Sequence, residues 1–150
     1  MEAVKVFLDT NVVLDYYTGR MGDSIAKTIV MAGQTPQIEL CISILTAVNV
    51  LYVSRKYNSP LKAKDIAELF QILPMDYQHY CEAQSIDIND FEDALQICCA
   101  RQSGCKVMVT RDKELLDGGS ASALILSPEE FLQRIGLRPQ GLKEAKGSHL

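Results

Sequence analysis

The sequence predicts an α/β domain with a mostly parallel central sheet of about five strands and helices on both faces of the sheet. Short apolar, β-branched runs alternate along the chain with segments of helical spacing, and parallel strands need such helical crossovers. The 150 residues, 47% of them hydrophobic, are enough for one domain with a sizeable core. Nothing resembles a linker or an internal repeat before the polar residues at the carboxyl end.

The amino-terminal half begins with the apolar run Val4–Leu8, a predicted buried strand that ends at Asp9. A helix over 11–17 follows, with Thr10 or Asn11 as its N-cap. The further elements expected in this half are a helix that begins at Asp23 or Ser24 and stops near Gly33 and Pro36, a strand over 38–42, a helix over about 45–56 and, after Pro60, a helix over about 62–71.

The carboxyl-terminal half continues this alternation. The elements expected here are a short strand at 72–73 before Pro74, a helix over 77–84, a helix capped by Asn89 or Asp90 that runs to Ala100 and is ended by Gly104, a strand over 106–109, a strand over 124–126 and a helix from Pro128 to near Gly136. We therefore expect residues 1–136 to form the domain and the polar residues 137–150 to form a flexible tail.

The charge balance excludes one kind of nucleic-acid binding. The net charge of −4, from 19 Asp and Glu against 15 Lys and Arg, argues against a protein that binds nucleic acid through a broad cationic surface. It does not exclude an enzyme that handles phosphates through a metal ion held by carboxylates. The placement of particular acids along the chain therefore decides between these classes.

The cysteine pattern and the amino terminus predict a cytoplasmic protein. The five cysteines are odd in number and form no C-x-x-C pair, and only His79 and His149 could join them in a zinc site, so reduced thiols are expected. The first ten residues have no apolar stretch of signal-peptide length, and the longest apolar run, 41–53, is too short to span a bilayer. We expect no membrane role.

Acidic residues follow two of the predicted strands. Asp9 comes directly after Val4–Leu8, and Asp112 follows the strand at 106–109. Asp90 and Asp93 are three residues apart at the start of a predicted helix and can share one face of it. Ligands of open parallel sheets bind beyond the carboxyl ends of the strands. Carboxylates gathered there repel one another unless a hard cation compensates, which favours Mg²⁺ or Mn²⁺.

Each of these acids also has a structural interpretation. Asp90 and Asp112 can each cap the helix that follows, and Asp93 in a first helical turn suits the helix dipole. Asp9 has fewer structural uses, because it ends a buried strand. The acids taken together are therefore stronger evidence for a metal site than any one of them alone.

Four segments of the chain resemble the PIN domain family, in particular the VapC-like toxins, in their order and spacing. These segments are FLDTNVVLDYY, ISILTAVNVLY, DFEDALQICCA and MVTRDKELL, and the last strand followed by Pro128 also fits the family ending. The resemblance covers roughly residues 4–135. It implies a flavodoxin-like, three-layer α/β/α sandwich and a ribonuclease that depends on Mg²⁺ or Mn²⁺.

The resemblance also implies a set of site residues. The first, third and fourth acids of the family fall on Asp9, Asp93 and Asp112, which would hold the metal for attack by water. The accessory residues that it implies are Asp90, Thr110 and Asn11, and the residues best placed to contact phosphate are Arg111 and Lys113, which flank Asp112.

This chain differs from the family pattern at the second acidic position. Asn49 stands at the end of Thr46-Ala47-Val48-Asn49, where a Glu is usual. The amide keeps an acceptor oxygen but loses one negative charge, so we expect weaker metal affinity. Asn49 stays in the predicted catalytic set, as a residue that orients metal-bound water.

Two other functions compete with a ribonuclease. A PIN-like module that binds RNA or protein without cleavage is motivated by Asn49 and by the acidic net charge. A haloacid-dehalogenase-like phosphatase would also place an acid after its first strand, but Asn11 stands where that class needs a general acid. A covalent mechanism through Ser43 or Thr46 is not expected, because no His lies nearby in the sequence.

The resemblance finally implies partners. The substrate would be RNA, the protein would form a homodimer, and an antitoxin protein would cover the acidic site.

Overall fold

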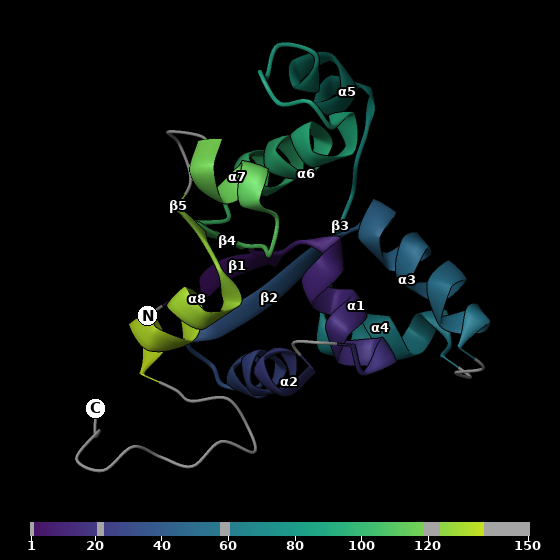
Figure 1. The fold of residues 1–150 in the computed structure, drawn as a ribbon, viewed down its shortest axis with the longest axis vertical. Helices are drawn as coiled ribbons and strands as arrows, with labels where there is room; N and C mark the ends of the chain where they lie inside the picture. Colours follow the sequence, from purple (N-terminus) through teal and green to yellow (C-terminus); the bar gives the residue numbers. More distant parts are fainter. Residues whose placement is uncertain (1, 21–22, 58–60, 119–123, 137–150) are drawn as a thin grey trace.

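The structure, a computed structural model, describes residues 2–20, 23–57, 61–118 and 124–136. Within these residues five parallel strands form one sheet in the order β3-β2-β1-β4-β5 (Figure 1). The strands are β1 (Val4–Leu8), β2 (Ile38–Ser43), β3 (Gln71–Leu73), β4 (Val107–Val109) and β5 (Leu124–Leu126). The predicted α/β class with a parallel sheet is confirmed.

Eight helices accompany the sheet in the described part of the chain. They are α1 (Thr10–Thr18), α2 (Asp23–Ala32), α3 (Ile44–Lys56), α4 (Ala63–Leu69), α5 (Tyr77–Ala83), α6 (Phe91–Gln102), α7 (Lys113–Gly118) and α8 (Pro128–Ile135). Figure 1 shows α6 and α7 on one side of the sheet and α1, α2 and α8 on the other.

The core has two layers, one on each face of the sheet. The side chains of β1 contribute to both layers, because successive residues of a strand point to opposite faces. Val6 and Leu8 pack in a cluster with buried side chains of α1, α2, α3, α4 and α8. Phe7 packs on the other face in a cluster with side chains of α6 and α7, including Ile97 and Leu115. Helix α5 packs on α6 through Ala83. The result is the three-layer sandwich that the resemblance implies.

The strand order places a topological switch between β1 and β4. From β1 the chain proceeds to β2 and β3 on one side, and then returns to β4 and β5 on the other side of β1. Leu8 and Val109 are paired in register, and the backbone N–H of Asp9 donates to the carbonyl of Val109 at 2.9 Å. Asp9 and Thr110 therefore leave the sheet side by side, at the kind of edge where open α/β sheets bind ligands.

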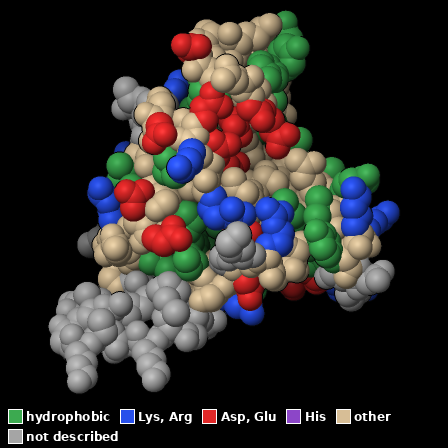
Figure 2. All heavy atoms as spheres, in the orientation of Figure 1, with side chains coloured by type: hydrophobic (Ala, Val, Ile, Leu, Met, Phe, Trp, Pro, Cys, Tyr) green, Lys and Arg blue, Asp and Glu red, His purple; other side chains and the backbone are tan. Residues whose placement is uncertain are grey.

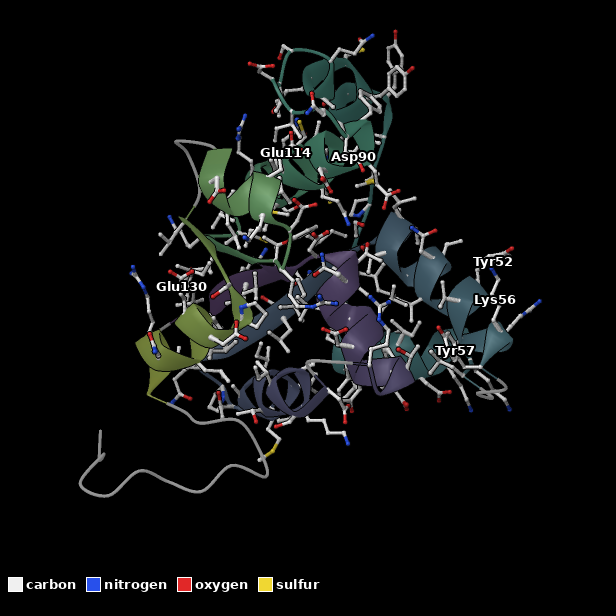
Figure 3. All side chains as sticks on the ribbon, in the orientation of Figure 1. Tyr52, Lys56, Tyr57, Asp90, Glu114 and Glu130 are labelled. Atoms are coloured by element: carbon white, nitrogen blue, oxygen red, sulfur yellow. The ribbon has the colours of Figure 1, made fainter. Side chains whose placement is uncertain are left out.

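Helix boundaries agree with the sequence prediction in some places and differ in others. The cap of α1 is Asp9 and not Thr10 or Asn11, because the Asp9 carboxylate accepts the N–H of Thr10. Helix α4 ends at Leu69 instead of about residue 71, since Gln71 already pairs with β2. The predicted start at Pro128 is confirmed, with a capping box between Ser127 and Glu130, which is labelled in Figure 3.

Several expectations fall on residues that the structure does not describe. The proposed flexible tail, 137–150, and Pro60 before α4 lie outside the described residues. All five cysteines lie within them and are free thiols. None of the described helices is long and apolar enough to cross a membrane.

Candidate metal centre

Asp9 ends β1 with a buried carboxylate that is surrounded by hydrogen-bond donors. Its Oδ1 accepts from the N–H of Thr10 at 2.9 Å and from Gln96 Nε2 at 3.5 Å. Its Oδ2 accepts from Thr110 Oγ1 at 2.7 Å and from Asn11 Nδ2 at 3.3 Å. Burial raises the pKa of Asp9 above its ordinary value, although the Thr110 hydrogen bond opposes this. The prediction that Asp9 has few structural uses is wrong, since it caps α1.

Asp93 lies in the first turn of α6, and its environment differs from that of Asp9. The residue is only 8% exposed, and its Oδ2 has no hydrogen-bond partner among the described residues. Burial, and then the charges of Asp9, Asp90 and Asp112, raise the pKa of Asp93 to about 7. The surroundings of this carboxyl group therefore favour its neutral form when no cation is bound.

Asp112 and Glu114 complete a compact acidic group with Asp93. Each of the three residues offers one carboxylate oxygen, and these oxygens all lie within 4.8 Å of one another. Asp112 Oδ1 accepts the N–H groups of Glu114 at 2.8 Å and Leu115 at 3.3 Å, which confirms that Asp112 caps α7. Figure 2 shows acidic side chains gathered over this part of the molecule, and Glu114 is labelled in Figure 3.

Glu114 was missed in the sequence interpretation. The signal available was its position two residues after Asp112 at a predicted helix start, where the cap brings the first-turn side chains close to the capping carboxylate. The N–H of Asn89 donates to Glu114 Oε2 at 3.4 Å. This contact links the loop before α6 to α7.

Asn49 on α3 faces a different acid from those just described. Its Nδ2 donates to Glu92 Oε2 at 3.5 Å. Burial, followed by the charges of Asp90 and Asp9, raises the pKa of Glu92. Asp90 accepts the N–H of Glu92 at 2.9 Å and is the N-cap of α6, as its structural interpretation predicts.

A buried polar network lies beneath Asp9. Gln96 Nε2 contacts Thr46 Oγ1 at 2.7 Å and Thr10 Oγ1 at 3.1 Å, and the two threonine hydroxyls are 2.7 Å apart. Gln96 and Thr46 are both fully buried. The network joins α1, α3 and α6 at the edge of the sheet. Gln96 was also missed, although a Gln one turn after Asp93 on the apolar side of a helix signals a buried hydrogen-bond network.

Arg111 is engaged in a structural contact. Its Nε and Nη2 donate to the two carboxylate oxygens of Asp15 at 2.7 and 2.9 Å, and Asp15 is 1% exposed. The backbone N–H of Arg111 also donates to Asn11 Oδ1 at 3.2 Å. Helix α1 thus holds the segment that carries Asp112 at two points. Lys113 is exposed and forms no ion pair with any described residue.

Thr110 connects the two acids that end β1 and β4. Its hydroxyl donates to Asp9 Oδ2 and accepts the N–H of Asp112 at 3.0 Å.

We expect Thr110→Val to lower the free energy of unfolding by about 1–2 kcal/mol, because a near-isosteric side chain leaves a buried carboxylate without its shortest donor. Chemical denaturation would measure this loss, and Thr110→Ser should retain most of the stability. Equal stability of the Val variant would show that this bond contributes little.

The predicted site residues thus occupy one edge of the sheet in two groups. Asp93 and Asp112 meet at coordination range together with Glu114, whereas Asp9 is held by its own donors and acts on Asp93 through its charge. The carboxylate oxygens are hard ligands, and the donor-less Oδ2 of Asp93 lacks the compensation that buried charges need. The residues present therefore fit a hard divalent cation.

Comparison with known sequences connects this arrangement to characterised proteins. A family model described as PIN domain matches residues 5–114. The chain is 28% identical over 143 residues to "Ribonuclease VapC1" of Aquifex aeolicus (strain VF5), a match that covers 89% of this chain and 97% of that protein.

Solved structures share the fold. A toxin–antitoxin complex from Klebsiella pneumoniae contains a chain that superposes with a TM-score of 0.63 at 22% identity, covering 82% of this chain and 97% of that one. Mycobacterium tuberculosis VapC20, described as a sarcin–ricin loop cleaving toxin, superposes with a TM-score of 0.60 at 15% identity, covering 79% and 98%. At these identities the similarity shows the fold alone.

Proposed function

The chain belongs to the PIN domain family, and from this premise we propose that it is a ribonuclease that hydrolyses RNA phosphodiester bonds with Mg²⁺ or Mn²⁺. One observation carries the proposal: Asp93 is buried, its Oδ2 receives no donor from the residues that the structure describes, and its carboxylate lies at coordination range from Asp112. The ribonuclease with which the chain shares 28% identity supports the same reaction class.

We assign the metal to Asp9, Asp93 and Asp112. Asp93 and Asp112 would bind directly, and Asp9 would act mainly through its charge or through a bound water, since four donors already occupy its oxygens. When bound, the ion supplies a water of lowered pKa and offsets charge on the scissile phosphate. Asn49 and Asp90 would orient water at the rim, while Thr110 and Asn11 keep Asp9 in place.

Two cationic side chains, Arg111 and Lys113, flank Asp112 in the sequence. Lys113, next to Asp112, is free to meet a phosphate, whereas the guanidinium of Arg111 is bound to Asp15. We therefore reassign Arg111 from phosphate contact to positioning of the Asp112 segment. Binding of RNA would then depend on the loaded metal more than on a cationic surface, in keeping with the net charge of −4.

An RNA cleavage assay tests the proposed function. The purified protein should cut RNA with Mn²⁺, lose this activity in EDTA and regain it when Mn²⁺ is restored. Asp9→Asn serves as the control for a contaminating nuclease. Equal cleavage by the wild type and Asp9→Asn would refute the assignment. RNA binding without cleavage in either protein would favour the binding module that Asn49 motivates.

We also propose an antitoxin partner, because a structural neighbour is a toxin–antitoxin complex. A groove lined by apolar parts of α1, α2 and α4 suits an amphipathic segment of such a partner. Its lining residues are Tyr16, Tyr17, Lys27, Val30, Met31, Gln34 and Leu69. A toxin of this kind would work in the cytoplasm, where its RNA substrates are.

We propose that the protein is a homodimer through the outer face of α3. Ile44, Val48 and Tyr52 follow one another at four-residue spacing on this helix, and all three are exposed. An apolar hollow lined by Ile44 and Met75 continues the surface past β3, the edge strand of the sheet. Figure 3 shows Tyr52 on the outside of α3.

Val48→Glu is expected to convert the dimer to a monomer, because it places a charge in the middle of this apolar stripe. Light scattering after size-exclusion chromatography would measure the change. Met31→Glu is the matched control: it adds the same charge at an exposed apolar position of α2, in the proposed antitoxin groove, and should leave the dimer intact. A wild-type protein that is monomeric at all concentrations would refute the proposed dimer.

A further inference from the structure

Glu114 is the acid of this edge that the sequence interpretation did not include. One of its oxygens lies within 4.8 Å of carboxylate oxygens of both Asp93 and Asp112. None of these three residues forms an ion pair with any Lys, Arg or His in the described part of the chain. Three carboxylates at this separation repel one another unless they are protonated or share a cation.

An independent observation indicates that the group is arranged for a ligand. Asp93 is more than nine-tenths buried, and its Oδ2 receives no donor from the described residues. By contrast, the buried Asp9 in the same region is supplied with four donors. A buried carboxylate that has one oxygen unsatisfied among the described residues, and that lies close to two other carboxylates, has the environment of a cation ligand.

Glu114 is also held in place by the backbone. Asp112 caps α7 by accepting the N–H of Glu114 itself, so the position of Glu114 depends on that of Asp112. The N–H of Asn89 binds Glu114 Oε2 from the loop before α6. An oxygen of Asp93, in the first turn of α6, and an oxygen of Glu114, in the first turn of α7, thus lie within 4.8 Å of each other.

We propose that Glu114 is a direct ligand of the divalent cation together with Asp93 and Asp112, an inference that rests on the metal site of the proposed function. Glu114 restores the negative charge that is lost at Asn49, whose amide donates to Glu92 instead. The ligand set is thereby shifted from α3 toward α7. Binding of the cation ties the start of α7 to the first turn of α6.

Titration with Mn²⁺ tests this inference without reference to catalysis. Glu114→Gln keeps the size of the side chain and removes its charge, and we expect the Kd for Mn²⁺, measured by calorimetry, to rise at least about 10-fold. Glu68→Gln is the matched control, because Glu68 is exposed on α4, far along the chain from the acidic group, and its variant should bind Mn²⁺ within about twofold of the wild type.

The outcomes separate this inference from the proposed function. If the wild type binds Mn²⁺ and Glu114→Gln binds it equally well, Glu114 is not a ligand, while the site of Asp93 and Asp112 stands. If the wild type itself binds no Mn²⁺ at millimolar concentration, the proposed metal site fails and this inference fails with it. Thermal unfolding in EDTA checks that Glu114→Gln folds, and we expect it to be at least as stable as the wild type, since it removes a repelling charge.

Discussion

Asp93→Asn is expected to abolish metal-dependent RNA cleavage and at the same time to stabilise the metal-free protein. The loss of activity, by at least about 100-fold, follows because the amide cannot supply the charge that holds the cation and its water. The gain in stability follows because Asp93 is buried beside other acids and has an oxygen without a hydrogen-bond partner in the described part of the chain. Opposite effects on activity and stability are typical of a residue retained for function.

The stability gain should depend on pH in a defined direction. The pKa of Asp93 is raised from 3.8 to about 7, so between these values the folded protein binds a proton that the unfolded chain has released. Stability of the metal-free wild type therefore falls as the pH rises through this range, and the full penalty is present above pH 7. At pH 8 we expect Asp93→Asn to be more stable by about 1–2 kcal/mol, allowing for solvent screening at the rim.

Thermal unfolding in EDTA at several pH values measures this difference. The two melting temperatures should coincide near pH 4 and separate by a few degrees at pH 8. Addition of Mn²⁺ should raise the melting temperature of the wild type and not that of the variant. A variant that is less stable than the wild type at pH 8 would show that the Asp93 carboxylate stabilises the fold.

Arg111→Ala is expected to destabilise the protein by about 2–4 kcal/mol, because it leaves the buried carboxylate of Asp15 without its bidentate partner. Among the described residues, the other cation paired with Asp15 is Arg20, at 3.6 Å and partly exposed. Since Arg111 directly precedes Asp112, affinity for Mn²⁺ should fall as well. Arg111→Lys should recover only part of the stability, because an ammonium group cannot form the two parallel hydrogen bonds.

Chemical denaturation and Mn²⁺ titration together distinguish this role from a contact with phosphate. A positioning residue changes the free energy of unfolding and the metal affinity of the RNA-free protein, whereas a phosphate contact would change neither. Lys113→Ala, at the neighbouring exposed position, is the control and should alter stability by less than about 0.5 kcal/mol. An Arg111→Ala protein of unchanged stability that binds RNA weakly would contradict the structural assignment.

Local patterns in the sequence were sufficient for the fold class and for most elements. Apolar runs such as Val4–Leu8 predict buried strands because a strand covered on both faces has no polar side. Asp90 and Pro128 mark helix starts through local capping and backbone geometry, and the structure confirms both. Errors occurred where two elements meet, as at Gln71, which pairs with Cys41 of β2 although its local sequence continues a helix.

The acidic residues at the ends of β1 and β4 were also predictable, since parallel strands carry their carboxyl ends to the same edge. What the sequence could not predict is how each carboxylate is used. Asp9 and Asp93 are both buried acids near that edge, yet Asp9 receives four donors and one oxygen of Asp93 receives none from the described residues. Two of those donors, Gln96 and Thr110, are about 90 to 100 positions away from Asp9 in the chain.

The sequence by itself therefore determined the parallel α/β fold, the family and the edge of the sheet at which the acids gather. Periodicity, caps and motif order are local properties, and they can be read without knowledge of the folded chain. Only the tertiary structure decided that Arg111 binds Asp15, that Asn49 faces Glu92 and that Glu114 joins Asp93 and Asp112. These contacts bring together segments that are distant in sequence, and their geometry depends on how the helices pack on the sheet.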